Sequence, residues 1–203
     1  MLHGTKNFCD DGVNEGDGNG CLVAQTQDRI KGWDEQGTAT HASQTDEKAK
    51  NKSEYFGLGS IEVSEFDNWC AWSLDLKGSE FFDIYLKNLS TGEIIEQKIN
   101  NTSGSITWDL EEKSFFYSRL DKFHRPKQIF KHILGTSTEN DQLIFEEKDE
   151  TFTCGISITS DEKYFIIGTS DHITTEEYFF PTDARDIKPT LFQKRKKKPR
   201  KRT

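Results

Sequence analysis

The chain has 203 residues and a net charge of −8, which is enough sequence for one ordinary domain with its own core. Hydrophobic residues make up only 33%, but fifteen phenylalanines bury large apolar areas and exclude a wholly disordered protein. No apolar run approaches the roughly 20 residues of a membrane span, and the start shows no secretory signal, so we expect a cytoplasmic protein without a membrane partner. The four scattered cysteines are therefore expected to be reduced, with Cys154 buried in a strand.

Residues 1–52 lack any regular apolar period, and we expect an irregular segment of low order. Two sets of metal-ligand residues occur in it. A calcium loop needs Asp at its first position and Glu at its twelfth, where the chain has Glu15 and Thr26. The second set contains two His and two Cys that could bind zinc, but their spacings match none of the usual pairs of zinc ligands. We therefore expect no metal and no cofactor; the sets are Glu15, Asp17, Asn19 and Gly20 for calcium, and His3, Cys9, Cys21 and His41 for zinc.

Residues 53–190 contain a repeat. The segments 63–73, 108–118 and 158–168 each combine an apolar residue, a polar turn and an apolar run that ends in a small residue. The repeats are offset by 45 and then 50 residues. Self-similarity of roughly 40–50 residues with several short strands per unit is typical of β-propeller blades.

The apolar patterns inside each unit indicate strands. Residues 82–87 and 154–158 alternate apolar and polar side chains, as a half-buried strand does. The continuous runs "SFFY" and "KYFIIG" predict strands buried on both faces between blades. We expect Ile84, Ile129 and Phe179 to be equivalent positions of the repeat. The sequence thus predicts an all-β fold, an incomplete propeller of about three antiparallel blades, because a closed ring typically needs four to eight.

The stretch "FFYSRLDKFHRPKQIF" (115–130) holds the densest chemical cluster. Asp121 and His124 could form an acid–base pair, but no Ser or Cys nucleophile is placed to use it. We favour a loop between two strands, in which Arg119 and Asp121 form a charge-assisted hydrogen bond and His124 is partly exposed. The neighbouring Arg125 adds charge, and the loop could also face another domain.

A second polar cluster, "SDHITTEE", contains Asp171, His172 and Glu176. These side chains could bind a metal, but the surrounding Ser and Thr suit a hairpin loop equally well, and we favour the loop. The aromatic residues are expected in the core rather than as a platform for nucleic-acid bases.

Residues 191–203 are expected to form a disordered basic tail, with eight Lys or Arg in the last ten positions. The remaining 193 residues have 19 basic and 35 acidic side chains, a net charge of −16. Such a tail could bind nucleic acid, but no aromatic interleaves with its cations and the rest of the chain is acidic. A nucleic-acid partner is therefore disfavoured.

Several strings in this order resemble the N-terminal propeller of oligopeptidase B (protease II), in the prolyl oligopeptidase family of serine peptidases. They cover roughly residues 54–185 and include "YFGLGSIEVS", "GSEFFDIYLKNLSTGE", "NTSGSITWD", "FFYSRLDKFHRPKQIFKHILGT" and "FEEKDETF". The resemblance implies a seven-bladed propeller that caps an α/β-hydrolase domain. It also implies a parent enzyme that cleaves short peptides after Lys or Arg, with the propeller admitting peptides and excluding folded proteins.

The nucleophile of that family lies in a G-x-S-x-G elbow, which does not occur in this sequence. No catalytic residue can be assigned here. We therefore expect a truncated, non-catalytic propeller domain, for which frameshift or gene splitting would account. The alternatives are an interaction module that complements a separately encoded hydrolase half, or a degenerate gene product without activity.

Overall fold

The computed structural model describes residues 55–196, and in this range it contains eleven β-strands, one short 3₁₀ helix and no α-helix. No helix of the described range could therefore span a bilayer. The candidate calcium and zinc ligands lie outside it. The elements are β1 (Gly57–Val63), β2 (Trp69–Asp75), β3 (Phe82–Asn88), β4 (Ile94–Trp108), β5 (Ser114–Leu120), β6 (Pro126–Ile133), η1 (Thr138–Asn140), β7 (Gln142–Glu146), β8 (Thr153–Ile158), β9 (Tyr164–Ser170), β10 (Thr175–Pro181) and β11 (Thr190–Gln193).

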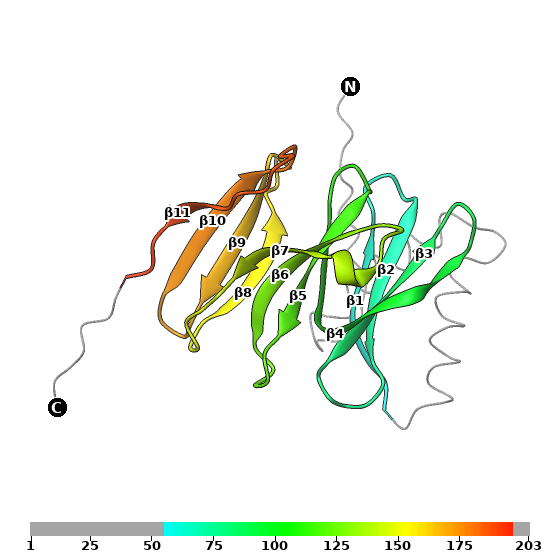
Figure 1. Ribbon diagram of the computed structural model, residues 1–203, viewed down its shortest axis with the longest axis horizontal. Coiled ribbons are helices and arrows are strands. Elements are labelled where there is room, and N and C mark those ends of the chain that lie inside the picture. The colour runs from blue at the N-terminus through cyan, green and yellow to red at the C-terminus, as the bar shows by residue number, and fades with distance from the viewer. Residues whose placement is uncertain (1–54, 197–203) are drawn as a thin grey trace, which may run out of the picture. The chain divides into compact units, whose positions relative to one another are not determined.

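The strands form two antiparallel sheets, ordered β1-β2-β3-β4-β5-β6-β7 and β11-β10-β9-β8. Strand β4 serves two blades, because its first part pairs with β3 and its last part pairs with β5. The strands therefore group into three four-stranded blades (Figure 1). Blade I is β1 to β3 with the first part of β4, blade II is the second part of β4 with β5 to β7, and blade III is β8 to β11. The predicted all-β fold with about three unclosed antiparallel blades is confirmed.

The repeat is carried by one turn that recurs between the first and second strand of every blade. Asp67, Glu112 and Glu162 occupy it in the left-handed region, with φ of 58°, 55° and 58°. Their offsets are the 45 and 50 residues of the predicted repeat. In each copy, the amide of this residue donates a hydrogen bond to the carbonyl three positions earlier. Because non-glycine residues seldom adopt this conformation, its recurrence identifies a shared blade geometry.

The bend in β4 depends on Gly104, which has φ of 87°. A Cβ atom at this position would lie 3.0 Å from the ring of Phe82 and 3.1 Å from the hydroxyl of Ser73. The Gly104 carbonyl accepts hydrogen bonds from the hydroxyls of Ser60 (2.6 Å) and Ser73 (2.8 Å). Glycine therefore allows β4 to pass close to blade I while it changes partner strands.

Apolar cores fill the spaces between neighbouring blades. In β5, Phe115 packs into the core between blades I and II, whereas Phe116 packs into the core between blades II and III. All residues of "SFFY" are buried, as predicted for a strand between two blades. The corresponding prediction for "KYFIIG" is wrong: Phe165 is buried, but Tyr164 keeps 39% of its surface exposed. The reason is that no described blade covers the second face of blade III.

The pairing of β10 corrects two further expectations. Ser73, Ser118 and Gly168 are the last residues of the three aligned segments. Ser73 pairs with Ile84 and Ser118 pairs with Ile129, as the repeat requires, but Gly168 pairs with Glu177 rather than with Phe179. The β9–β10 hairpin is shorter than its two counterparts, which shifts the register. In addition, β11 pairs with β10 through Gln193, so the first residues expected in the basic tail belong to the sheet.

Candidate functional site

The cluster at 115–130 forms the hairpin between β5 and β6. The Asp121 carboxylate accepts hydrogen bonds from the amides of Phe123 (2.7 Å) and Arg125 (3.0 Å). It also accepts one from the Arg125 guanidinium, at 3.0 Å. The expected partner of Asp121 was Arg119, and this is wrong. The Arg119 guanidinium instead lies over the ring of Phe130, 4.7 Å from its centroid.

The Asp121–His124 acid–base pair does not form. The backbone amide of His124 donates to the Asp121 carbonyl, and its Nδ1 lies 3.6 Å from a carboxylate oxygen of Glu80. Its ring packs at 4.4 Å against Phe81 in the neighbouring blade, and 41% of the side chain is exposed. The loop interpretation with a partly exposed His124 agrees with this geometry.

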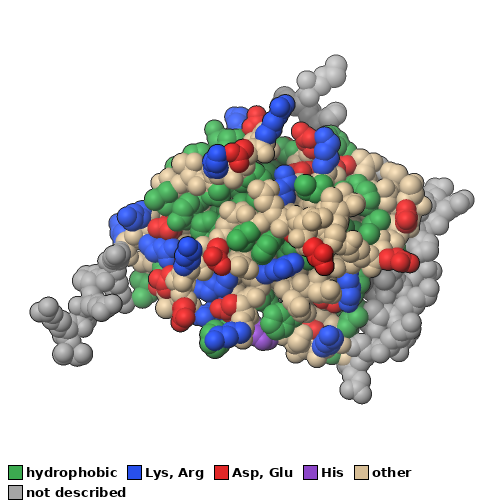
Figure 2. Space-filling view, in the orientation of Figure 1, with side chains coloured by type: hydrophobic (Ala, Val, Ile, Leu, Met, Phe, Trp, Pro, Cys, Tyr) green, Lys and Arg blue, Asp and Glu red, His purple; other side chains and the backbone are tan. Residues whose placement is uncertain are grey.

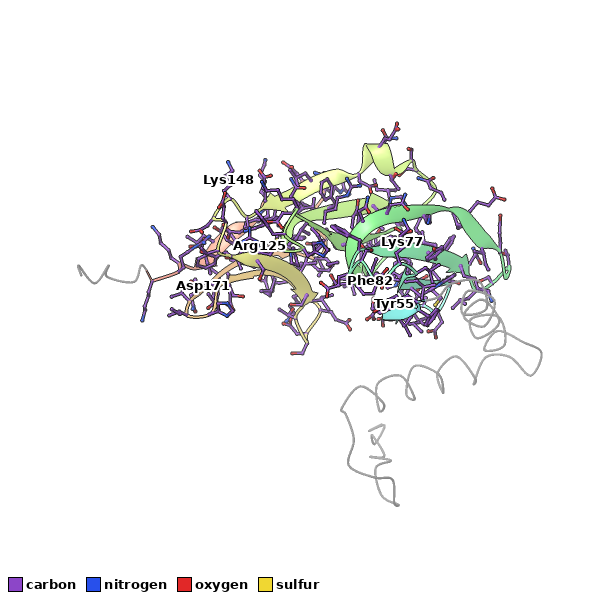
Figure 3. The ribbon with its side chains drawn as sticks, turned by 90° about the horizontal axis from the view of Figure 1, so that it is seen from below. Tyr55, Lys77, Phe82, Arg125, Lys148 and Asp171 are labelled. Atoms are coloured by element: carbon purple, nitrogen blue, oxygen red, sulfur yellow. The ribbon has the colours of Figure 1, made fainter. Side chains whose placement is uncertain are left out.

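Asp121 has a counterpart at the end of the second strand in each of the other blades. Asp75 accepts amide hydrogen bonds from Lys77 and Glu80, and Asp171 accepts them from Ile173 (2.7 Å) and Thr174 (2.6 Å). These amide bonds hold the pKa of Asp171 below its usual range. The three aspartates thus fix the backbone of three hairpins. Asp171 is labelled in Figure 3, in the hairpin of blade III.

Glu176 does not join Asp171 and His172 in one site. Its carboxylate accepts hydrogen bonds from the Tyr178 hydroxyl (2.6 Å) and from the Arg195 guanidinium (3.1 Å), which also pairs with Glu147 at 2.7 Å. Both carboxylates are buried, and Arg195 stacks 3.9 Å from the centroid of Phe152. Burial raises the pKa of Glu176, but the hydrogen bonds from Arg195 and Tyr178 outweigh it and lower the pKa to about 2.

This ion-pair cluster could not be recognised in the sequence, because Arg195 belongs to the run of cations that is expected to form the basic tail. Its partners come from the start of the β7–β8 loop and from β10, 48 and 19 residues away. Two more cations hold the same loop: Lys127 donates to the carbonyls of Asp149 (2.5 Å) and Phe152, and Arg125 donates to that of Glu150. The connection between blades II and III is therefore held by three cationic side chains.

A third polar network is buried in blade II. Asp141 accepts hydrogen bonds from the Tyr117 hydroxyl (2.6 Å) and from Nδ1 of His132 (2.7 Å). Burial, followed by the adjacent carboxylate, raises the pKa of Tyr117 above its ordinary value. Within residues 55–196 no hydroxyl or thiol is hydrogen-bonded to His132 or His124, so neither imidazole has a nucleophile to activate. Burial, followed by the Glu147 charge, raises the pKa of Cys154 to about 12, which keeps this thiol protonated, as expected for a buried cysteine.

The surface offers no dominant charge on the face drawn in Figure 2, where acidic and basic side chains are interspersed. The outer face of blade III is different. Tyr164 and Phe179 stack edge to face with ring centroids 5.5 Å apart, and Phe179 lies 6.2 Å from Phe192. Phe192 is 70% exposed. This aromatic strip (Tyr164, Phe179 and Phe192) is the exposed counterpart of the apolar faces that are buried between the other blades.

The sequence matches the family model described as "Prolyl oligopeptidase, N-terminal beta-propeller domain" over residues 44–200. It is 38% identical over 109 residues to Protease 2 of Moraxella lacunata, covering 53% of this chain and 16% of that protein. It is 30% identical over 124 residues to Dipeptidyl aminopeptidase BI of Pseudoxanthomonas mexicana, covering 61% and 17%. The chain thus spans about a sixth of the length of these relatives. In the homologues, the propeller domain precedes a hydrolase domain in the same polypeptide.

Two of the solved structures that share the fold are oligopeptidases. Oligopeptidase B from Leishmania major aligns with a TM-score of 0.70 at 21% identity, over 74% of this chain and 21% of that one. Oligopeptidase B from Trypanosoma brucei, in a closed form with covalently bound antipain, gives 0.68 at 21% identity, over 75% and 21%. The blades, their repeat and the match over residues 44–200 lead to one conclusion. This chain belongs to the prolyl oligopeptidase family and corresponds to its N-terminal β-propeller domain.

Proposed function

We propose that these blades are the non-catalytic part of an oligopeptidase B-like serine peptidase, in which the propeller limits access to the peptidase site. The observation that supports this most directly is the stack of three equivalent four-stranded blades in a chain whose sequence matches the propeller domain of the family. A propeller typically closes with four to eight blades, so three supply part of a ring.

The first strands of the blades form the part of this assembly that would face a central channel. The indole N–H of Trp108 in β4 donates to the Glu62 carbonyl in β1, at 3.1 Å. The Thr107 hydroxyl in the same strand donates to the Ile156 carbonyl in β8, at 3.3 Å. Side chains therefore link β1, β4 and β8 directly, which sets the spacing between blades at this edge.

We propose short basic peptides as the substrates that pass this gate, and the cytoplasm as the location. The net charge of −16 over residues 1–193 supports this substrate class, because an acidic surface raises the local concentration of cationic peptides. The attraction would weaken as salt is added.

The test is an assay of the purified 203-residue chain with a fluorogenic Arg–Arg coumarin peptide. We expect no release of the fluorophore, because neither His124 nor His132 is hydrogen-bonded to a hydroxyl or thiol within residues 55–196. Turnover that a serine-peptidase inhibitor abolishes would overturn the non-catalytic assignment. Added to a hydrolase domain that lacks a propeller, the chain should suppress cleavage of an unfolded protein more than cleavage of the short peptide. Equal suppression of both would contradict gating.

A second candidate is an interaction module that complements a separately encoded hydrolase half. The aromatic strip on blade III favours it, since an exposed apolar sheet face is suited to contact with another blade. Co-expression with a fragment that carries the remaining blades and the hydrolase domain should restore activity. Substitution of Phe192 by Ser should weaken that restoration, whereas a variant at Lys196 should not.

A further inference from the structure

A cavity of about 400 Å³ lies between blades I and II. One wall comes from β2, β3 and β4, and the other comes from β6 and the turn that follows it. This volume is at the lower end of the range of small-molecule sites, roughly 300–1,000 Å³. The walls are mostly apolar, with contributions from Trp69, Leu86, Ile95, Ile99 and Leu134.

One buried polar ring, His132, lines this cavity. Its side chain is only 4% exposed, and its Nδ1 lies 2.7 Å from Asp141, whose side chain is 2% exposed. The second oxygen of Asp141 accepts the Tyr117 hydroxyl. A carboxylate only accepts hydrogen bonds, so in the neutral imidazole the proton resides on Nδ1.

This tautomer leaves the other ring nitrogen, Nε2, as a hydrogen-bond acceptor on the edge of the ring opposite Asp141. Within residues 55–196, Nε2 of His132 has no hydrogen-bond partner. Nε2 is not among the fully buried side-chain atoms of this range that lack a partner, so it is accessible to water. A ligand that brings a donor into the cavity would replace that water as its hydrogen-bond partner.

We propose that this cavity binds a neutral aromatic molecule of one or two rings that donates one hydrogen bond to Nε2 of His132. The aromatic class follows from the indole of Trp69 in the wall, since aromatic rings favour stacked or edge-to-face contacts. The neutral class follows from the lining: besides His132, the polar side chains are the uncharged Gln97, Thr136 and Thr138. A charged ligand would be buried there without a counter-ion, which is unfavourable. This site does not depend on the gating function proposed above.

The direct test is isothermal titration calorimetry of the full chain with indole and with 1-methylindole, at about pH 8, where imidazole side chains are ordinarily neutral. The two probes differ in the N–H donor, so we expect indole to bind roughly tenfold more tightly. Equal affinities would overturn the assigned role of His132. Absence of binding for both at millimolar concentration would overturn the site.

Two substitutions on neighbouring residues of β4 distinguish filling of the cavity from a general effect of placing a bulky side chain on this strand. Gln97 lines the cavity and is exposed, whereas the exposed Glu96 points to the other face of the strand. Gln97→Trp should abolish indole binding and Glu96→Trp should leave it unchanged. A third variant, His132→Phe, should bind indole and 1-methylindole equally. Loss of indole binding in Glu96→Trp, or retention in Gln97→Trp, would contradict the proposal.

Discussion

The buried ion pairs of Glu176 provide a sharp test of how blades II and III are joined. The carboxylate accepts hydrogen bonds from Tyr178 and from both the guanidinium and the amide of Arg195. Glu176→Gln removes the negative charge but retains the shape of the side chain. Arg195 keeps Glu147 as its partner in this variant, so no buried cation is left unpaired.

The magnitude follows from the pKa of Glu176, which is about 2 in the folded chain against the usual 4.5. This difference corresponds to about 3 kcal/mol of folding free energy. Since 21% of the Arg195 side chain is exposed, solvent screening reduces the figure, and we expect the variant to lose about 2 kcal/mol at neutral pH. A lowered folded-state pKa stabilises the fold above pH 4.5, and this contribution is lost as the pH falls through about 2.

The assay is urea unfolding of the wild type and of Glu176→Gln across pH 2 to 7. The difference in unfolding free energy should shrink steadily as the pH falls below about 4.5 and should disappear near 2. The control is Glu177→Gln, on the same strand but on the opposite face, which should change stability by less than about 0.5 kcal/mol. A difference for Glu176→Gln that is below 0.5 kcal/mol at neutral pH, or that does not vary with pH, would refute the reasoning.

Three further substitutions test the blades themselves. Asp121→Ala removes the acceptor of two hairpin amides and should lower the unfolding free energy by about 1 kcal/mol in urea; unchanged stability would contradict its structural role. Phe116→Ala opens the core between blades II and III and should lower the unfolding free energy in urea by about 3–5 kcal/mol. A decrease below about 1 kcal/mol would contradict a tightly packed interface. Gly104→Ala should lower the melting temperature more than Gly92→Ala, because both glycines have positive φ but only Gly104 has side chains within 4 Å; equal shifts would contradict the close approach at the bend.

The repeat allowed much of the fold to be predicted, because it depends on local sequence. The turn residues Asp67, Glu112 and Glu162 recur at offsets of 45 and 50 residues, so aligning the segments placed the second strand of each blade correctly. The loop predicted within the stretch 115–130 lies between β5 and β6, as expected. Phe179 was misplaced because a shorter hairpin changes strand register without changing the apolar pattern.

The polar networks could not be predicted, because their members are distant in sequence or compete for the same partner. Asp121 lies close to both Arg119 and Arg125, and only the hairpin geometry selects Arg125. Arg195 reaches Glu147 across 48 residues, a distance at which charge alone gives no pairing information. Nothing in the sequence distinguished His132 from the other histidines either, since its burial depends on the blade to which it belongs.

The shared strand β4 has a mechanical consequence. Blades I and II are parts of one hydrogen-bonded sheet, because β4 runs from the edge of the first to the start of the second without interruption. Blade III is a separate sheet, tied to blade II by side-chain packing and by cations bound to loop carbonyls. A force that opens the assembly would therefore separate blade II from blade III first. These two blades can move apart and come together again without breaking backbone hydrogen bonds between strands.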